Sequence, residues 1–144
     1  MKFTASLVAL LSATGALAAP AAGAVSMMAA GNQWTIQSLN RVCNAADTTC
    51  TWNFKIFPGS GTATACKYVV SGAGASTKNG GPTKCGNFQI TSGWSGQFGP
   101  GNGFTTMSVV STGKHIIYPA YTDKQLAGGK VVKPDQAYTP ASLP

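Results

Sequence analysis

Polar and apolar residues alternate with a period of two along several short stretches of this chain. The clearest stretch is 51–56, where Trp52, Phe54 and Ile56 alternate with polar residues. Such alternation is typical of a β-strand that has one face buried and the other in water. We therefore expect these three apolar side chains to point into a core.

Similar short stretches, bounded by turn residues, recur along the chain. Strands are predicted for residues 34–42, 51–56, 66–70, 88–90, 105–111, 114–118 and 130–133. Thr112-Gly113 has the length of a two-residue hairpin loop, and no stretch of the sequence shows a sustained helical period. The pattern predicts an all-β fold, a small barrel or sandwich of about seven or more short antiparallel strands.

The N-terminal segment has the three parts of a secretory signal peptide. Lys2 precedes an apolar stretch that runs to Ala13, and Ala16-Leu17-Ala18 supplies small residues at the positions that signal peptidase reads. The apolar stretch is shorter than the roughly 20 residues that a membrane-spanning helix needs. We expect cleavage after Ala18 and a secreted, extracellular protein.

Behind this signal peptide, residues 1–18, the composition divides the chain into three parts. Residues 19–33 are rich in Ala, Gly and Met and are predicted to form a flexible N-terminal arm. Residues 34–133 hold all the predicted strands and form the β domain. Residues 134–144 hold three prolines and are expected to form an extended Pro-rich tail.

The β domain contains the four cysteines of the chain, Cys43, Cys50, Cys66 and Cys85. An even number in a small exported chain indicates disulfides, and the close Cys pairs typical of zinc sites are absent from the sequence. Three connectivities are possible. We favour Cys43–Cys50 and Cys66–Cys85, because each pair flanks a turn-rich or loop-like segment and would close one hairpin.

The chain is basic, with ten Lys and Arg, three Asp, no Glu and a net charge of +7. A basic surface suits anionic partners such as membranes, pectin-like polymers or nucleic acids. The lysines are scattered along the sequence, however, and do not form the dense run that favours nucleic-acid binding. We therefore expect no nucleic-acid partner.

Few side chains in the sequence could support catalysis. His115 is the single histidine, and Asp47, Asp123 and Asp135 supply the only side-chain carboxylates. A glycosidase needs two carboxyl groups at a controlled separation, and the Gly-x-Ser-x-Gly turn of many serine hydrolases is absent. We expect no catalytic residues, no metal, no cofactor and no enzyme activity.

The most distinctive stretch of the sequence is residues 92–106, with five glycines and three large aromatic residues. Glycine allows tight turns and close approach of the backbone. Aromatic residues on such a loop either cap the core or contact a partner, and both interpretations stay open. The second predicts a recognition surface made of Trp94, Phe98, Phe104, Tyr118 and Tyr121.

From Trp34 onward the sequence resembles a group of small secreted fungal proteins. The resemblance rests on the four cysteines and on residues 92–106, 118–124 and 128–135. The chain is similar to the rice-blast-type hypersensitive-response-inducing protein elicitors. A more distant likeness is to the Alternaria major allergen-type β-barrels, whose cysteine arrangement is lacking here.

The first resemblance implies a β-barrel-like fold with two disulfides and no catalytic chemistry. It also implies a fungal effector that plant cells perceive, with hypersensitive cell death and defence responses as the result. The expected partner of the monomer is a plant cell-surface protein or the plasma membrane. Two alternatives stay open: binding of a cell-wall polysaccharide through Trp94 and nearby aromatic residues, and antimicrobial or membrane action through the positive charge.

Overall fold

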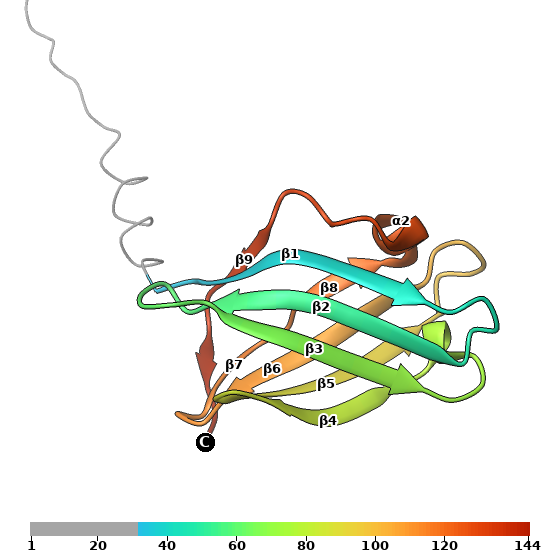
Figure 1. Cartoon of the computed structure of the whole chain (residues 1–144). Helices are drawn as coiled ribbons and strands as arrows, with labels where there is room; N and C mark the ends of the chain where they lie inside the picture. Colours follow the sequence, from blue (N-terminus) through green and yellow to red (C-terminus); the bar gives the residue numbers. More distant parts are fainter. Residues whose placement is uncertain (1–31) are drawn as a thin grey trace, which may run out of the picture. The chain divides into compact units, whose positions relative to one another are not determined.

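The computed structural model describes residues 32–144, which form two antiparallel β-sheets packed face to face (Figure 1). Ten strands follow one another along this part of the chain, with only short helical turns between them. The prediction of an all-β fold with several short antiparallel strands is confirmed. The predicted signal peptide, residues 1–18, and nearly all of the predicted arm, residues 19–33, lie outside the described residues.

The first sheet has the strand order β3-β2-β1-β9. Its members are β1 (Trp34–Cys43), β2 (Thr49–Phe57), β3 (Thr64–Ser71) and β9 (Gln136–Tyr138). The pairing of β1 with β2 shifts register between Gln37 and Asn40, where Ser38 has a φ of 52°. This bulge explains why Ile36 and Leu39, three positions apart, are both buried.

The second sheet has the order β10-β7-β6-β5-β4, and β8 also pairs with β6. Its members are β4 (Gly80–Cys85), β5 (Phe88–Ser95), β6 (Phe104–Ser111), β7 (His115–Ile117), β8 (Ala120–Thr122) and β10 (Ala141–Ser142). Between β6 and β7 the Lys114 N–H donates to the Ser111 carbonyl at 2.9 Å. This turn confirms the hairpin predicted around Thr112-Gly113.

Three short helical turns complete the described part of the chain: η3 (Ala75–Thr77), α2 (Asp123–Leu126) and η4 (Ala127–Gly129). The N-terminus of α2 has a capping box, in which Thr122 Oγ1 accepts from the Gln125 N–H and Gln125 Oε1 accepts from the Thr122 N–H. Such reciprocal capping satisfies backbone donors that a helix start leaves without partners. It fixes the position at which Asp123 begins the helix.

The core lies between the two sheets and follows the alternation of the sequence. Trp52, Phe54 and Ile56 are only 2%, 3% and 0% exposed, as predicted. Met107 and Val109 face them from the second sheet and belong to the same buried cluster. Burying a large apolar side chain stabilises a fold by about 1.5–3 kcal/mol, so this cluster is the main stabilising element.

Both open sides of the sandwich are closed by connections between the sheets. On one side the Cys66–Cys85 disulfide joins β3 to β4. On the other side β9 pairs with β1 and β10 pairs with β7, although only Thr139 and Pro140 separate β9 from β10. One terminal segment therefore belongs to both sheets, and it covers an edge strand of each.

Residues 130–133 do not form the predicted strand. Val132 is buried, and its backbone N–H donates to the Leu39 carbonyl at 2.8 Å, but this segment has no strand partner. The two adjacent valines in the sequence led us to expect a strand. In the structure, the buried Val132 side chain and one hydrogen bond to the bulge of β1 hold this segment in place.

The predicted boundary between the β domain and a Pro-rich tail also needs correction. Residues 134–144 contain β9 and β10, so they are part of the sheets. Both strands, like β8, have only two or three residues, which is too short for a periodic signal. The sequence of β4, Gly-Gly-Pro-Thr-Lys-Cys, lacks alternation, and this strand was not predicted either.

Candidate recognition site

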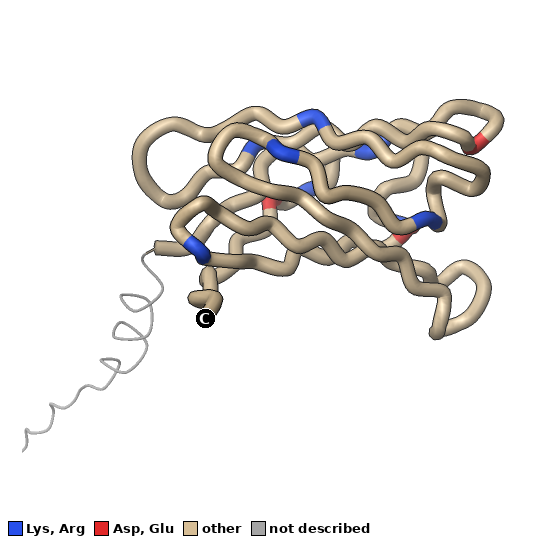
Figure 2. The backbone as a smooth tube through the Cα atoms, turned by 90° about the horizontal axis from the view of Figure 1, so that it is seen from below, with Lys and Arg blue, Asp and Glu red and all other residues tan. Residues whose placement is uncertain are grey.

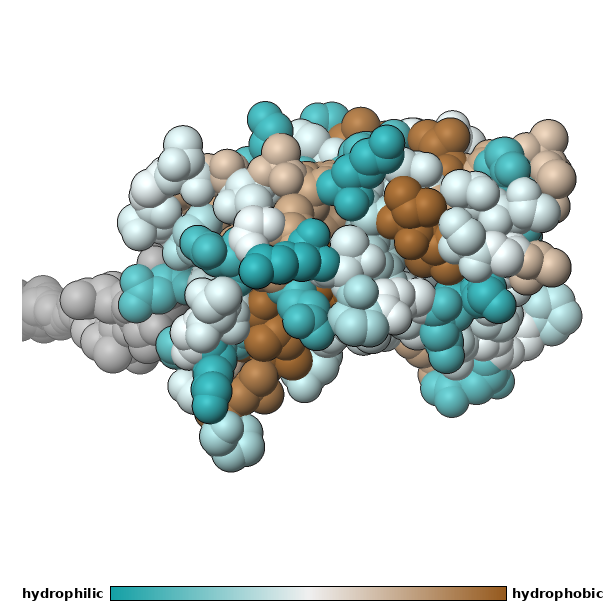
Figure 3. All heavy atoms as spheres, turned by 60° about the horizontal axis from the view of Figure 1, so that its bottom comes forward, coloured by the Kyte–Doolittle hydropathy of each residue, from teal (hydrophilic) through white to brown (hydrophobic). Residues whose placement is uncertain are grey.

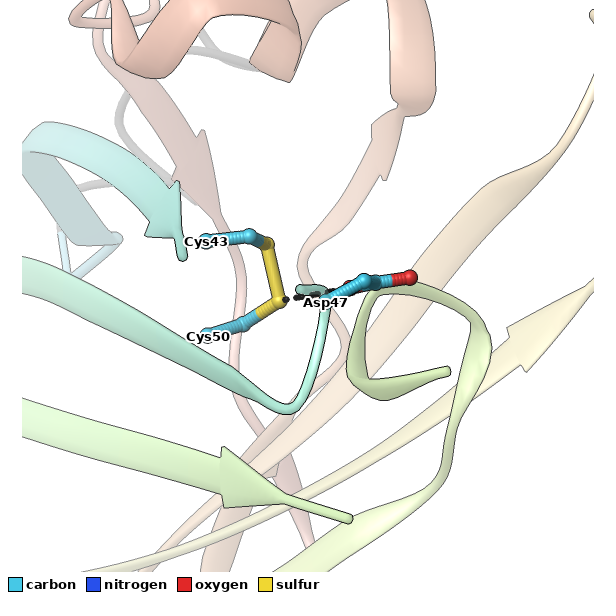
Figure 4. Close-up of side chains that lie close together, drawn as sticks. All are labelled: Cys43, Asp47 and Cys50. Atoms are coloured by element: carbon cyan, nitrogen blue, oxygen red, sulfur yellow. Dashed lines mark hydrogen bonds between the residues drawn. A yellow bond between two sulfur atoms is a disulfide. The ribbon is translucent and has the colours of Figure 1, made fainter. Parts of the chain in front are cut away.

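Both favoured disulfides are present, so the predicted pairing is confirmed. Cys43 ends β1 and pairs with Cys50 of β2, with their Cα atoms 3.9 Å apart. The Asp47 carboxylate lies 3.8 Å from the Cys50 sulfur (Figure 4). A disulfide sulfur carries no proton, so this is a contact rather than a hydrogen bond, and the three side chains are not a metal site, because neither sulfur is a free thiolate.

Asp47 instead links two loops at this end of the molecule. Its carboxylate oxygens accept from the Ser76 backbone N–H at 2.9 Å and from Ser76 Oγ at 2.7 Å. Its backbone carbonyl accepts from the Ala75 N–H at 2.9 Å. The β1–β2 turn and the β3–β4 connection are therefore fixed to each other.

The indole of Trp94 lies against the glycine-rich loop, defined here as residues 96–103. A Cβ atom added at Gly96 would come within 2.5 Å of the ring, and one added at Gly103 within 2.6 Å. Only glycine allows the backbone to lie this close to a flat ring. Of the two interpretations that the sequence left open for Trp94, the geometry favours capping of the core.

A carboxylate holds the Trp94 indole in this position. Trp94 Nε1 donates to Asp123 Oδ2 at 3.0 Å, and the Asp123 backbone N–H donates to the Gly103 carbonyl at 2.9 Å. Asp123 is the first residue of α2, so the capped helix start, the indole and the end of the loop form one connected unit.

Arg41 of β1 extends this unit to the first sheet. Its Nη1 lies 3.7 Å from Asp123 Oδ1 and donates to the Ser76 carbonyl at 3.3 Å. Its guanidinium lies over the Trp52 ring, 5.5 Å from the ring centroid. A largely buried charge of this kind is costly unless it is paired, so the nearby Asp123 carboxylate offsets part of the cost of burying Arg41.

The outer side of the glycine-rich loop presents aromatic surface to solvent. Phe98 is 65% exposed, and its ring stacks on Phe104 with centroids 5.8 Å apart and an angle of 26° between the planes. The loop is folded by two successive turns, with hydrogen bonds from the Gly99 N–H to the Gly96 carbonyl and from the Asn102 N–H to the Gly99 carbonyl.

The two tyrosines of the predicted recognition surface have opposite environments. Tyr118 is 58% exposed, whereas Tyr121 is only 1% exposed and packs against Trp52. The assignment of Tyr121 to the surface was therefore wrong. Residues three positions apart along an extended segment point to opposite faces, so both tyrosines could not share one surface here.

Tyr118 borders a shallow groove on the outer face of the second sheet. The register of β5 and β6 places Thr91 beside Ser108 and Gly93 beside Thr106. The groove is lined by Thr91, Ser92, Gly93, Thr106, Met107, Ser108 and Tyr118. The sequence did not predict this groove: the polar residues that alternate with the core positions of β6 indicate only that this strand has an outer face.

The candidate catalytic side chains are not brought together. Asp47 and Asp123 have the partners described above, and Asp135 accepts from the Ser38 N–H at 2.9 Å. His115 is exposed and follows the far end of β6, which spans about 24 Å from Phe104. Figure 2 shows Lys and Arg spread over the described residues without a dense cluster.

Hydrophobic side chains on the face drawn in Figure 3 occur as small separate groups among polar ones. Among the described residues, none of the helices has the length and apolar character needed to cross a membrane.

Comparison with known proteins gives a consistent result over nearly the whole described chain. Residues 35–143 match the sequence model of a family described as Effector TSP1. The chain is also similar to a protein of Hypocrea virens (strain Gv29-8 / FGSC 10586) that is named Effector TSP1. The two are 54% identical over 147 aligned positions, and the alignment covers 100% of both chains.

Proposed function

The chain belongs to the Effector TSP1 family of fungal effectors, and we propose that it is a secreted elicitor that plant cells perceive at their surface. Hypersensitive cell death and defence responses are the proposed outcome. The signal-peptide pattern of residues 1–18 supports secretion. The two disulfides also support it, because disulfides persist mainly in oxidising compartments outside the cytosol.

The observation that carries the proposed mode of recognition is the exposed Phe98 on the glycine-rich loop, whose ring stacks on the partly buried Phe104 of β6. Aromatic side chains, Phe among them, are enriched in interfaces, where a few residues supply most of the binding energy. The loop is held on its inner side by the indole of Trp94, which donates to Asp123. Asp123 is in turn paired with Arg41. A loop that is ordered before binding loses less conformational entropy when a partner is bound.

We propose recognition without catalysis as the mechanism. Each of the three carboxylates accepts a hydrogen bond from a different partner in the fold, at Ser76, Trp94 and Ser38. This gives each of these carboxylates a structural role, and no hydrogen bond among the described residues joins one of them to a second carboxylate or to His115. Perception of the folded surface by the plant accounts for an effector activity without a reaction.

Infiltration of the pure folded protein into leaves tests this function, with cell death and the oxidative burst as readouts. Phe98→Ala should raise the dose needed for cell death about tenfold or more, because truncation of an aromatic anchor commonly costs 2 kcal/mol or more. Val69→Ala, at a 40% exposed position of the opposite sheet, is the matched control and should keep full potency.

Absence of any response to the folded wild-type protein would overturn the elicitor function. Full potency of a folded Phe98→Ala variant would instead remove the glycine-rich loop from the recognition surface. Melting curves and near-ultraviolet dichroism of each variant separate a loss of recognition from a loss of structure.

A further inference from the structure

We infer that the outer face of the second sheet binds a neutral polysaccharide of the plant cell wall. This inference rests on the proposed function, since a secreted effector meets the wall before it reaches the plant cell surface. The groove face is defined here by Thr91, Gly93, Phe104, Thr106, Ser108 and Tyr118.

The groove face is a narrow platform with the exposed Tyr118 at one end and, at the other, the partly buried Phe104, whose ring stacks on Phe98. Along β6, Phe104 and Ser108 are four residues apart, about 14 Å in an extended strand. Tyr118 borders the groove together with Ser108. The floor between the two rings is therefore long enough for a short oligosaccharide.

Gly93 keeps the middle of this floor open. A Cβ atom added at Gly93 would meet only the Asn79 side chain, at 3.5 Å, which is an ordinary contact. Gly93 therefore has no requirement for close packing, unlike Gly96 and Gly103. Because glycine has no side chain, the outer face has free space at this position.

The side chains of the groove face match the two kinds of surface that a sugar ring presents. The hydroxyls of Thr91, Thr106 and Ser108 take no part in the side-chain hydrogen bonds found among the described residues, and they line an open groove. They are free to bond sugar hydroxyls. The exposed ring of Tyr118 offers a large, rigid apolar face against which the C–H face of a sugar can pack.

The three rows of the groove face carry no charged side chain, which favours a neutral ligand. Residues that lie side by side on β5, β6 and β8 form three rows across this face, and all of them are uncharged. The rows are Ser95-Phe104-Thr122, Gly93-Thr106-Ala120 and Thr91-Ser108, with Tyr118 bordering the third. The whole chain carries a net charge of +7. An anionic polymer would bind where basic side chains are exposed, as at Lys55 and Lys67 of the opposite sheet.

A polysaccharide also fits this face better than a protein or a membrane does. The core of a protein interface is usually more apolar than its rim, whereas hydroxyls occupy the centre of this groove. A membrane-binding surface combines apolar side chains with basic ones, and the central rows have no basic side chain.

Titration of the ¹⁵N-labelled protein, lacking residues 1–18, with cellohexaose and with xylohexaose tests the inference. Hexagalacturonate is the anionic comparison, and each titration is made at low and at high salt. One of the neutral sugars should shift the amide resonances of β5, β6 and Tyr118, with an affinity that does not change with salt, because screening acts on charges.

Two variants locate the site. Gly93→Val fills the floor of the groove, and Tyr118→Ala removes a ring that is 58% exposed and is not needed for the core. Each should weaken binding about tenfold or more. Ala65→Val adds similar volume at an exposed position of the first sheet and is the matched control, expected to bind like the wild type.

The inference is overturned if neither neutral sugar binds, or if both groove variants bind the sugar like the wild type. It is also overturned if hexagalacturonate alone binds and high salt abolishes that binding. If Gly93→Val does not fold, Tyr118→Ala alone decides. Leaf infiltration separates the two proposals. A leaf response without sugar binding overturns only the polysaccharide site, and sugar binding without a leaf response overturns only the elicitor function.

Discussion

The two ends of the β-sandwich are held by different kinds of interaction. At the loop end, which carries α2 and the glycine-rich loop, a polar unit of Trp94, Asp123 and Arg41 joins the two sheets. At the hairpin end, Trp34 packs edge-on against Phe88 with ring centroids 5.4 Å apart, and a disulfide joins the sheets. Figure 1 shows these ends to the right and to the left.

The difference shows how stability and positioning are separated in this fold. Apolar packing is strong but not directional, and it suits an end that only has to stay closed. Hydrogen bonds and a paired charge are directional, and they suit an end where an irregular loop has to present Phe98 in one position. The polar unit is expected to contribute less to folding and more to the geometry of the recognition surface.

The largest expected effect is the loss of stability when Trp34 at the hairpin end is truncated. Trp34→Ala should lower the free energy of unfolding by about 3–5 kcal/mol, because it leaves a cavity beside Phe88. Phe98→Ala at the loop end should change it by less than about 0.5 kcal/mol, since Phe98 is mostly exposed. Urea unfolding measures both, and equal losses would contradict the comparison.

The two disulfides also distinguish the ends. Replacing Cys66 and Cys85 by Ala should cost about 3 kcal/mol, and replacing Cys43 and Cys50 about 2 kcal/mol, because the sequence separations are 19 and 7 residues. The longer bridge restricts the unfolded chain more. Denaturant unfolding of the two double variants gives the order, and the reverse order would show that native-state interactions outweigh the entropy of the unfolded chain.

The polar unit at the loop end should show coupling between its members. Asp123→Ala and Arg41→Gln should each cost about 1–3 kcal/mol, because each leaves buried polar groups without a partner. The double variant should cost less than the two single losses added together. Asp135→Ala, which removes an exposed hydrogen bond to Ser38, is the comparison outside the unit.

A matching readout follows the loop itself. Hydrogen exchange at the amides of residues 96–103 should accelerate in Asp123→Ala and stay unchanged in Asp135→Ala. If the exchange rates of the loop do not respond to Asp123, the loop position does not depend on the polar unit.

The smallest effect at neutral pH concerns the buried tyrosines. Burial raises the pKa of Tyr121, and the neighbouring Tyr138 raises this pKa further; burial also raises the pKa of Tyr68 and of Tyr138 itself. A raised pKa in the folded state means that the stabilisation is complete below pH 10, the ordinary tyrosine value, and is lost as the pH rises above it.

Thermal melts between pH 8 and pH 12 should therefore show a falling melting temperature from about pH 10 upward. Tyr121→Phe removes a buried hydroxyl without a hydrogen-bond partner among the described residues, so it should change stability at neutral pH by less than about 1 kcal/mol and reduce the alkaline loss. Tyr118→Phe, at an exposed position, is the matched control. An identical alkaline loss in Tyr121→Phe and wild type would contradict this account.

Local features of the sequence determined the fold class and the disulfides. The alternation in 51–56 identified a strand and its inward side chains because a strand repeats every two residues whatever it pairs with. The pairing Cys43–Cys50 and Cys66–Cys85 followed from turn-rich segments between partners that are close in sequence. The glycine-rich stretch was likewise visible as the place where the chain departs from regular strands.

Only the tertiary structure decided which aromatic residues face outward and which charges meet. Tyr121 is buried and Tyr118 exposed because β8 pairs with one particular stretch of β6. Arg41 and Asp123 lie far apart in sequence. They meet because the last part of β1 and the first residue of α2 both lie at the loop end of the sandwich. Strands such as β9 and β10 are too short for a periodic signal and exist because β1 and β7 offer unpaired edges. Pairing between distant segments leaves no local trace, so the groove of the second sheet could be recognised only after β5 and β6 were placed side by side.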